Sequence, residues 1–260
     1  MNRLVAVLAI LRLTAVTAMA LPTQMLAVRF GWPLARRLPV WWHRRALSAL
    51  GVRVRVAGAP AASRPLLVTP NHSSWLDIPV IGSLMPISFV AKAEVASWPL
   101  FGLFAKLQRS VFVDRTRRTA TGRAADELGR RLADGDCMVL FPEGTSSTGD
   151  VVLPFRSALL GAARGAIDAG GHAEVWVQPM TVAYTRIVGM PIGRAERHRV
   201  GWTGDVDLPP HLWGVLTAGG IDVEIVWGEA RPFDAATDRK ALARDLESAV
   251  RGGLLAVLRP

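Results

Sequence analysis

The stretch LLVTPNHSSWLD, residues 66–77, decides the fold class. Its first four residues form a short apolar run with β-branched side chains, and such a run, stopped by a proline, predicts a buried strand. The polar segment NHSS follows, and we expect a helix to begin near Ser74. A strand that passes directly into a helix is the unit from which α/β sheets are built.

The same alternation of strand and helix continues along the chain. Apolar runs predict further strands at residues 52–56, 87–91, 110–113, 137–141 and 174–184. Helices are expected at about residues 119–133, 156–168 and 237–258, with a short amphipathic piece at 97–107. This alternation predicts an α/β fold over residues 51–260, with a mostly parallel central sheet flanked by helices on both faces.

Positive charge is concentrated near the N-terminus. The 260 residues carry a formal net charge of +10 at pH 7, yet residues 1–76 contain ten Arg and neither Asp nor Glu. The rest of the chain is balanced, with 21 basic and 21 acidic side chains. Such a basic segment favours either nucleic acid or anionic lipid as a partner.

The apolar character of the same segment favours lipid. Residues 4–10 and 13–28 are almost entirely apolar, and tryptophans and arginines follow them, as is typical of a membrane interface. The uncharged run 13–28 is shorter than the roughly 20 residues of a spanning helix, and Pro22 interrupts it. We therefore expect residues 1–50 to form a helical hairpin or an interfacial anchor on the inner (cytoplasmic) membrane, with the α/β domain facing the cytoplasm. No nucleic-acid partner is expected, because the charge follows the membrane-like segment.

A cleaved signal peptide is the alternative for this segment. Residues 18–20, Ala-Met-Ala, imitate a cleavage site. Arg12 lies inside the apolar region, and further arginines follow it, which disfavours cleavage. We therefore interpret the segment as an anchor.

Cysteine, histidine and serine usage gives no sign of a metal site, a disulfide or a hydrolase. Cys137 is the single cysteine, so it can form neither a disulfide framework nor a cysteine cluster, and we expect it in the core. His43 stands beside two tryptophans and is interpreted as an interfacial residue. His172, His198 and His211 lack neighbours at metal-ligand spacing. The G-x-S-x-G motif of serine hydrolases is absent.

Three of the apolar runs end in residues that can carry chemistry. LLVTP is followed by His72, SVFV by Arg115 and CMVLFP by Glu143. Ligands of open α/β sheets bind outside the carboxyl ends of the strands, because the loops there share one rim. The sequence therefore predicts one crevice surrounded by a histidine, an arginine and a glutamate.

His72 and Asp77 have the spacing of a catalytic pair. A histidine can take a proton from a hydroxyl, which contributes about 10² to 10⁴ in rate, and it acts best when a carboxylate orients its other ring nitrogen. We expect Asp77 to fold back from the second helical turn toward the ring, with Ser73 or Ser74 as the cap. Taken alone, H-x-x-x-x-D is also compatible with a structural histidine beside an unrelated aspartate.

Four blocks together are more specific than this pair. NHSSWLD, FVDR, FPEGTSS and VQPMTVAY, within residues 65–185, resemble in order and spacing the glycerolipid acyltransferase family that includes the 1-acyl-glycerol-3-phosphate acyltransferases. The resemblance implies a catalytic role for His72 and Asp77, and an α/β sandwich preceded by membrane-associated helices. It implies acceptor binding or lining of the acceptor and acyl region by Arg115, Glu143, Gly144, Thr145 and Pro179.

One position departs from the family pattern. The third block usually continues with arginine, whereas this chain has Ser146, which we count with the acceptor-binding residues. An arginine fork matches phosphate oxygens, so its absence weakens the case for a phosphorylated acceptor. Residues 92–102, 141–163, 183–194 and 204–213 look most like the lyso-ornithine-lipid O-acyltransferases of this family. Lys92 and Arg115 remain as cations, so lysophosphatidate is the alternative acceptor.

The resemblance thus predicts an O-acyltransferase that moves a fatty acyl group from a thioester of acyl carrier protein or coenzyme A to the hydroxyl of a lysolipid. His72 would deprotonate this hydroxyl, and backbone amides near the first helix would stabilise the oxyanion. No metal or bound cofactor is required. The non-enzymatic alternative is a peripheral lipid-binding or lipid-transfer protein, which would not need His72 paired with Asp77.

Overall fold

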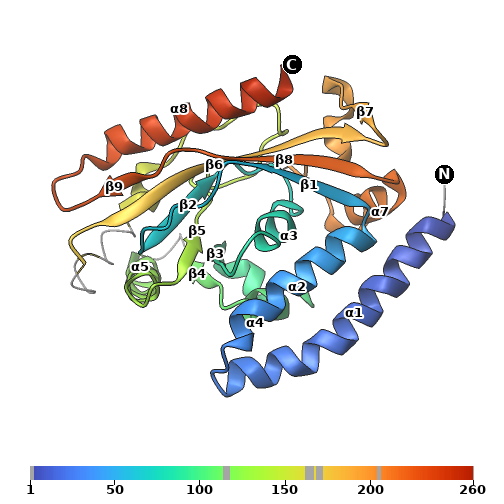
Figure 1. Ribbon diagram of the computed structural model, residues 1–260, viewed down its shortest axis with the longest axis horizontal. Coiled ribbons are helices and arrows are strands. Elements are labelled where there is room, and N and C mark those ends of the chain that lie inside the picture. The colour runs from blue at the N-terminus through green and yellow to red at the C-terminus, as the bar shows by residue number, and fades with distance from the viewer. Residues whose placement is uncertain (1–2, 114–117, 162–166, 168–171, 204–205, 260) are drawn as a thin grey trace.

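A nine-stranded sheet forms the centre of the computed structural model, which describes residues 3–113, 118–161, 167, 172–203 and 206–259. Helices cover both faces of this sheet (Figure 1). Its strands are β1 Val52–Ala57, β2 Leu66–Pro70, β3 Ser88–Lys92, β4 Val111–Val113, β5 Cys137–Val139, β6 Val175–Ile187, β7 Met190–Pro191, β8 Ile221–Trp227 and β9 Arg231–Phe233. The described helices are α1 Arg3–Arg29, α2 Leu34–Ala49, α3 Asp77–Gly82, α4 Phe101–Leu107, α5 Arg118–Ala133, α7 Leu208–Ala218 and α8 Arg239–Leu258, with 3-10 turns η1 Ala93–Ser97 and η2 Arg194–Arg199.

The sheet is mixed but mostly parallel along its main path. The strand order is β1-β8-β6-β2-β5-β3-β4, with β7 and β9 each paired to β6. The antiparallel pairs are those of β6 with β7, β8 and β9. The other pairs, including β6 with β2, are parallel. The predicted α/β fold with a mostly parallel sheet and flanking helices is confirmed.

Most predicted elements are present, with shifted ends. The helix α5 begins one residue before the expected 119–133, and β5 is shorter than the predicted run 137–141. Of the expected helix 156–168, residues 157–161 and 167 are helical and Arg156 is not, while 162–166 and 168 lie outside the described residues. The predictions do not include β7, α7, β8 or β9. The alternation in IDVEIVW, the sequence of β8, is a strand signal that identifies at least this one.

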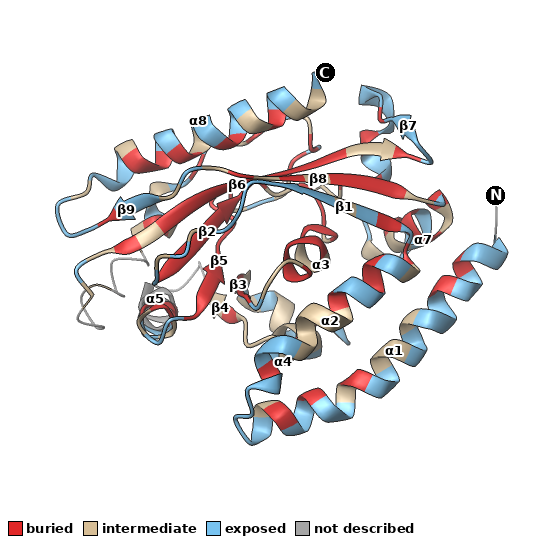
Figure 2. Ribbon diagram, in the orientation of Figure 1, coloured by how far each residue is buried: buried red, intermediate tan, exposed pale blue. Residues whose placement is uncertain are grey.

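Burial on both faces explains why β2 reads as an uninterrupted apolar run. Leu66 and Val68 belong to the core beneath α2, α3 and α7, whereas Leu67 belongs to the core beneath α5 and α8. Figure 2 shows the central strands buried between these two helical layers. A strand in the middle of a covered sheet has no solvent face, so alternation of apolar and polar residues disappears.

The length of β6 brings a distant part of the chain to the end of β2. Pro70, the last residue of β2, lies opposite Met180 of β6. Beyond that point β6 continues to Ile187, where it pairs with β8 instead. The second half of β6 therefore lies past the carboxyl end of β2, beside the loop that carries His72.

The first two helices form a hairpin against one face of the molecule. The helix α1 packs along α2, and α2 contacts α3 and β1 (Figure 1). The predicted hairpin is confirmed as a structure, while a separate role for residues 1–50 stays a prediction. Many apolar side chains of α1 are exposed, among them Leu4, Leu8, Leu11, Met19, Met25 and Leu26.

The expectation that Pro22 interrupts the apolar segment is wrong. The helix α1 is continuous from Arg3 to Arg29 and contains Pro22 in its interior. A proline inside a helix removes one backbone hydrogen bond and crowds the preceding turn, which can bend the helix without ending it. At about 1.5 Å per residue, α1 is about 40 Å long, and its length and composition would allow it to cross a membrane.

His43 is not an interfacial residue, because α4 and the residue next to α4 cover it. Its side chain is buried, and Nε2 donates to Oε1 of Gln108 at 3.0 Å. A Cβ atom on Gly82 would lie 2.5 Å from the ring, so only glycine fits beneath it. Burial lowers the pKa of His43 to about 4, which keeps the ring neutral.

Candidate active site

The loop after β2 places His72 at the rim of the sheet, where its ring meets Asp77. His72 Nδ1 donates to Asp77 Oδ2 across 2.7 Å. The ring stacks on Phe141 with the two ring centroids 4.1 Å apart. The side chain of His72 is 21% exposed, and within the described residues its Nε2 atom has no hydrogen-bond partner. This nitrogen is therefore open to a substrate hydroxyl.

Asp77 closes a tight turn instead of standing in a second helical turn. The helix α3 begins at Asp77, three residues after the expected start near Ser74. Ser74 Oγ accepts from the N–H of Leu76 at 3.3 Å, so the expected serine does bond a backbone donor in the turn that leads into this helix. The backbone N–H groups of Ser73 and Ser74 donate to Asp77 Oδ2 at 2.8 and 3.0 Å. The carboxylate satisfies these donors itself, as aspartates commonly do in turns, and this brings it back beneath His72.

Tyr184 completes the surroundings of this carboxylate. Its hydroxyl, on the second half of β6, donates to Asp77 Oδ1 at 2.7 Å. Both side chains are buried, and a buried carboxylate needs such donors to remain charged. Burial and the neighbouring Asp77 raise the pKa of Tyr184 well above its ordinary value, so the phenol stays a neutral donor.

Glu143 clamps two loops together by accepting two backbone hydrogen bonds. Oε1 accepts from the N–H of His72 at 2.7 Å, and Oε2 accepts from the N–H of Leu153 at 2.9 Å. The side chain is 2% exposed. Burial raises the pKa of Glu143 to about 7, although the two backbone donors act in the opposite direction. Glu143 therefore lies beside His72 as predicted, but it faces backbone amides.

This raised pKa predicts how Glu143 affects stability as the pH changes. The pKa is about 7 in the folded protein and 4.5 for an ordinary glutamate, so the folded state holds this proton more tightly. The contribution of Glu143 to the free energy of unfolding is therefore greatest below the ordinary pKa and declines as the pH rises through 7. Relative to Glu143→Gln, the wild-type protein should lose up to about 3 kcal/mol between about pH 5 and pH 8.

Chemical denaturation in detergent at several pH values measures this difference between the two proteins. Glu196→Gln is the control, because Glu196 is exposed on η2, where it accepts from Arg199, and it is not among the charges that act on Glu143. A difference between wild type and Glu143→Gln that stays constant with pH would contradict the prediction.

Three backbone amides in the loop before α3 are engaged by carboxylates. The N–H of His72 donates to Glu143, and those of Ser73 and Ser74 donate to Asp77. These three groups are thus committed to holding the two carboxylates. Which amides near the helix stabilise the oxyanion stays a prediction.

The rest of the third block forms a turn beside His72. Gly144 has φ +76°, which only glycine adopts freely, and Thr145 is exposed. Ser146 Oγ donates to the carbonyl oxygen of Trp202 at 2.5 Å. The N–H of Ser147 donates to the carbonyl oxygen of His72 at 2.8 Å, so this block supports the histidine from its backbone side.

The remaining predicted site residues lie in different surroundings. Lys92 is exposed at the end of β3, and β5 lies between β3 and β2. Pro179 is buried in β6, and its ring packs against Gly228, where a Cβ atom would fall 2.7 Å away. Arg115 lies outside the described residues.

Three supporting residues were not predicted: Tyr184, Ser147 and Phe141. Tyr184 is the single tyrosine of the chain, at the end of the apolar run 174–184, and a polar hydroxyl there is a usable signal. Ser147 and Phe141 flank the Glu143 block, but their contacts with His72 depend on how the loops fold. No local pattern reports them.

Neither metal chemistry nor thiol chemistry finds a place among the described residues. No three histidine, cysteine, aspartate or glutamate side chains in that part of the chain are grouped so that they could hold a metal ion. Cys137 is buried in β5, as expected, and burial raises its pKa to about 12. The chemistry that the site does offer is general-base catalysis by a histidine oriented by a buried aspartate.

Comparisons with known proteins agree with this chemistry. The chain is 48% identical to the lyso-ornithine lipid O-acyltransferase of Brucella abortus over 96% of this chain and 94% of that protein. It is 45% identical to the lyso-ornithine lipid O-acyltransferase of Rhizobium meliloti, with 92% and 82% covered. It is 31% identical to the 1-acyl-sn-glycerol-3-phosphate acyltransferase of Neisseria gonorrhoeae, with 85% and 82% covered.

A solved structure and a family model extend the comparison to the fold. The crystal structure of the 1-acyl-sn-glycerophosphate acyltransferase PlsC from Thermotoga maritima superposes with a TM-score of 0.66 at 22% identity, over 100% of this chain and 97% of that one. Residues 52–183, which contain the loop of His72 and the strand of Tyr184 up to its neighbour Ala183, match the family model named Acyltransferase. The chain therefore belongs to the acyltransferase family and is an acyltransferase of lipid biosynthesis.

Proposed function

We propose that this enzyme transfers a fatty acyl group from a thioester of acyl carrier protein or coenzyme A to the hydroxyl of lyso-ornithine lipid, which forms ornithine lipid. The observation that carries the proposal is the His72–Asp77 pair, in which one ring nitrogen is held at 2.7 Å and the other is open. The relatives that act on lyso-ornithine lipid, at 48% and 45% identity, support this acceptor.

The mechanism is direct transfer without a covalent enzyme intermediate. His72 Nε2 takes the proton of the acceptor hydroxyl as its oxygen attacks the thioester carbonyl. Asp77 holds the ring and stabilises the imidazolium that forms. The tetrahedral intermediate then collapses, the carbon–sulfur bond breaks, and the imidazolium returns its proton to the departing thiolate.

Ser146 supports an acceptor without phosphate. Its hydroxyl donates to the backbone of Trp202, so this position offers no cation to a ligand. A phosphate monoester favours a bidentate arginine at such a position. A zwitterionic ornithine headgroup has no phosphate and needs one cation fewer. Lys92, which is exposed, remains as a polar contact for either headgroup.

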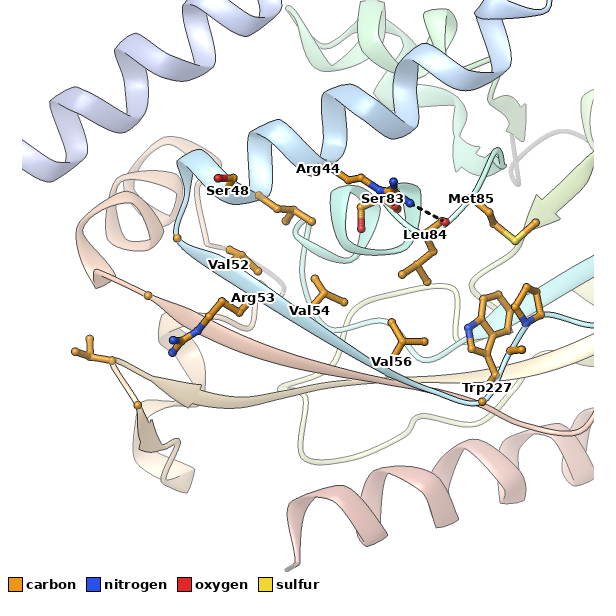
Figure 3. Close-up of a pocket in the computed structure, with 18 of the residues that line it drawn as sticks. Arg44, Ser48, Val52, Arg53, Val54, Val56, Ser83, Leu84, Met85 and Trp227 are labelled. Atoms are coloured by element: carbon orange, nitrogen blue, oxygen red, sulfur yellow. Dashed lines mark hydrogen bonds between the residues drawn. The ribbon is translucent and has the colours of Figure 1, made fainter.

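An apolar groove supports a lipid substrate. The groove, about 930 Å³ in volume, runs between α2 and β1 (Figure 3). Its apolar lining includes Leu47, Val52, Val54, Val56, Leu84 and Trp227. Strand β1 extends about 3.3 Å per residue, so its six residues give the groove a length of about 20 Å, enough for a long alkyl chain. The helix α3 joins the two places, with Asp77 at its start and the groove residue Ser83 just after its end.

The helical hairpin supports a membrane setting. Exposed apolar residues of α1, with the arginines of both helices, suit the interface of an anionic leaflet. We place the protein at the inner membrane with its α/β domain toward the cytoplasm. The lysolipid then reaches the site from the bilayer, and acyl carrier protein delivers the acyl group from the water phase.

Acceptor competition tests this function. Purified full-length protein is offered lyso-ornithine lipid or lysophosphatidate in vesicles, each with an acyl thioester of acyl carrier protein or coenzyme A. We expect kcat/KM to be at least about tenfold higher for lyso-ornithine lipid, the equivalent of one charged hydrogen bond. Preference for lysophosphatidate would overturn the acceptor, and binding without turnover would favour a lipid-transfer protein.

Two variants of one position sharpen this test. Ser146→Arg restores the cation that the phosphate-directed pattern carries, so it should raise the relative rate with lysophosphatidate. Ser146→Ala removes the hydrogen bond to Trp202 without adding charge, and it should leave the acceptor ratio unchanged. An equal ratio in Ser146→Arg and Ser146→Ala would show that this position does not select the headgroup.

A further inference from the structure

We propose that Tyr184 is a positioning residue for the acyl transfer: its hydroxyl locks the carboxylate of Asp77 so that the other oxygen meets the ring of His72. The proposal rests on the proposed function, because it assigns Tyr184 a part in the base mechanism of His72. Tyr184 does not touch the reacting atoms. It acts through Asp77.

The hydrogen bonds of Asp77 show why this donor matters. Oδ2 receives three donors, namely His72 Nδ1 and the N–H groups of Ser73 and Ser74. Oδ1 receives Tyr184 Oη at 2.7 Å. All three donors to Oδ2 come from residues 72–74, on the same short loop, so they cannot by themselves fix the carboxylate relative to the sheet. The tyrosine ties it to β6.

Tyr184 itself is held rigidly. Its side chain is 1% exposed and lies in the core beneath α2 and α3. Its carbonyl oxygen accepts from Arg197 Nη1 at 3.3 Å, and the same nitrogen donates to the carbonyl of Gly149. Loop, strand and turn therefore meet at this tyrosine. A rigid donor of this kind keeps Asp77 in one rotamer during the catalytic cycle.

Charge gives a second consequence of the same contact. The hydrogen bond disperses part of the negative charge of Asp77, which also faces His72 and, more weakly, Glu143. Without Tyr184, Asp77 becomes a less compensated anion and stabilises the protonated ring of His72 more strongly. The acidic limb of the pH–rate profile of Tyr184→Phe should then move to higher pH. A purely structural residue would not move it.

The kinetic test compares two variants on strand β6. Tyr184→Phe removes one hydroxyl that reaches Asp77, whereas Thr181→Val removes one hydroxyl that reaches the carbonyl of Val250 on α8. We expect kcat to fall about 10- to 100-fold in Tyr184→Phe, the range for a hydrogen bond to a charged group, with KM for the lysolipid within about twofold. Thr181→Val should keep kcat within about twofold. Equal kcat values in the two variants, or an unmoved pH–rate profile, would overturn the proposal.

A spectroscopic test needs no turnover, because Tyr184 is the single tyrosine of the chain. The ultraviolet phenolate band therefore reports this residue alone. In the folded wild-type protein we expect no phenolate at about pH 10, where free tyrosine is half ionised. In Asp77→Asn the negative neighbour is gone, so the band should appear at lower pH than in wild type, with circular dichroism confirming that the fold persists. Identical phenolate titrations would show that the two groups are not coupled.

The two tests separate this proposal from the proposed function. If wild-type protein turned over no lysolipid, the base mechanism would fail, yet the phenolate titration would still report whether Tyr184 and Asp77 are coupled. If wild type were active and Tyr184→Phe behaved as Thr181→Val, the function would stand and the positioning role would be refuted.

Discussion

Replacing His72 with alanine should lower kcat by about 10³-fold or more, the largest effect of a single side chain in this protein. One nitrogen of the His72 ring is hydrogen-bonded to a buried carboxylate, and the other is open. Among the described residues of the site, no other group combines these two properties. General-base catalysis contributes about 10² to 10⁴ in rate, and alanine leaves no substitute base. Turnover of lyso-ornithine lipid with acyl thioester, measured at saturation, checks the expectation.

The control for this variant separates lost chemistry from lost structure. The side chain of His72 is part exposed and its ring stacks on Phe141 at the rim of the sheet, so His72→Ala should fold and still bind the lysolipid. His198→Ala is the matched substitution, because His198 is exposed and its ring donates to the carbonyl of Ala195. His198→Ala should retain full activity. Substantial turnover in folded His72→Ala would remove the base from the mechanism.

Asp77→Asn should be almost as damaging, although it changes a single atom. In the Ser-His-Asp triad this kind of substitution lowers kcat about 10⁴-fold, because the histidine is held in the wrong tautomer. Asp77 uses both of its carboxylate oxygens: one accepts from His72 and two backbone N–H groups, and the other accepts from Tyr184. An asparagine has only one acceptor oxygen for these donors. We expect kcat to fall at least about 10²-fold.

Stability must be measured beside activity for this variant. Asp77→Asn leaves a buried donor facing other donors, so its thermal midpoint in detergent should fall as well. Asp136→Asn is the matched control, because Asp136 is also buried and accepts from Arg109 and Arg131 just before β5 begins, at the end of the parallel strands opposite the rim that carries His72. Folded Asp136→Asn should keep its turnover. Parallel losses of kcat in the two folded variants would mean that Asp77 matters only for the fold.

The sheet was predictable because its signals are local. Leu66 and Val68 on one face and Leu67 on the other must all be apolar in a strand covered on both sides, and that requirement is written into consecutive residues. The antiparallel pairing of β6 with β8 was not predictable in this way. It depends on β6 running past the end of β2, which no local pattern records.

In the candidate site, too, the local contacts were predictable and the long-range contacts were not. His72 and Asp77 lie five positions apart, so their meeting follows from one turn. Glu143 was expected near them because it too follows a strand, but its engagement with backbone amides depends on the fold of two loops. The contact of Tyr184 with Asp77 spans more than a hundred residues and needs the finished sheet. The contacts that could not be predicted are therefore those that form between segments far apart in the chain.

Because Tyr184 lies on β6, it is synthesised long after the N-terminal helix α1. The apolar helix α1 precedes Tyr184 by roughly 150 residues, so at 5–20 residues per second the ribosome releases it about 8 to 30 s earlier. The hydrogen bond between Tyr184 and Asp77 therefore cannot form until well after α1 has left the ribosome. If α1 docks on the membrane as proposed, docking can begin before the histidine–aspartate pair acquires its tyrosine partner.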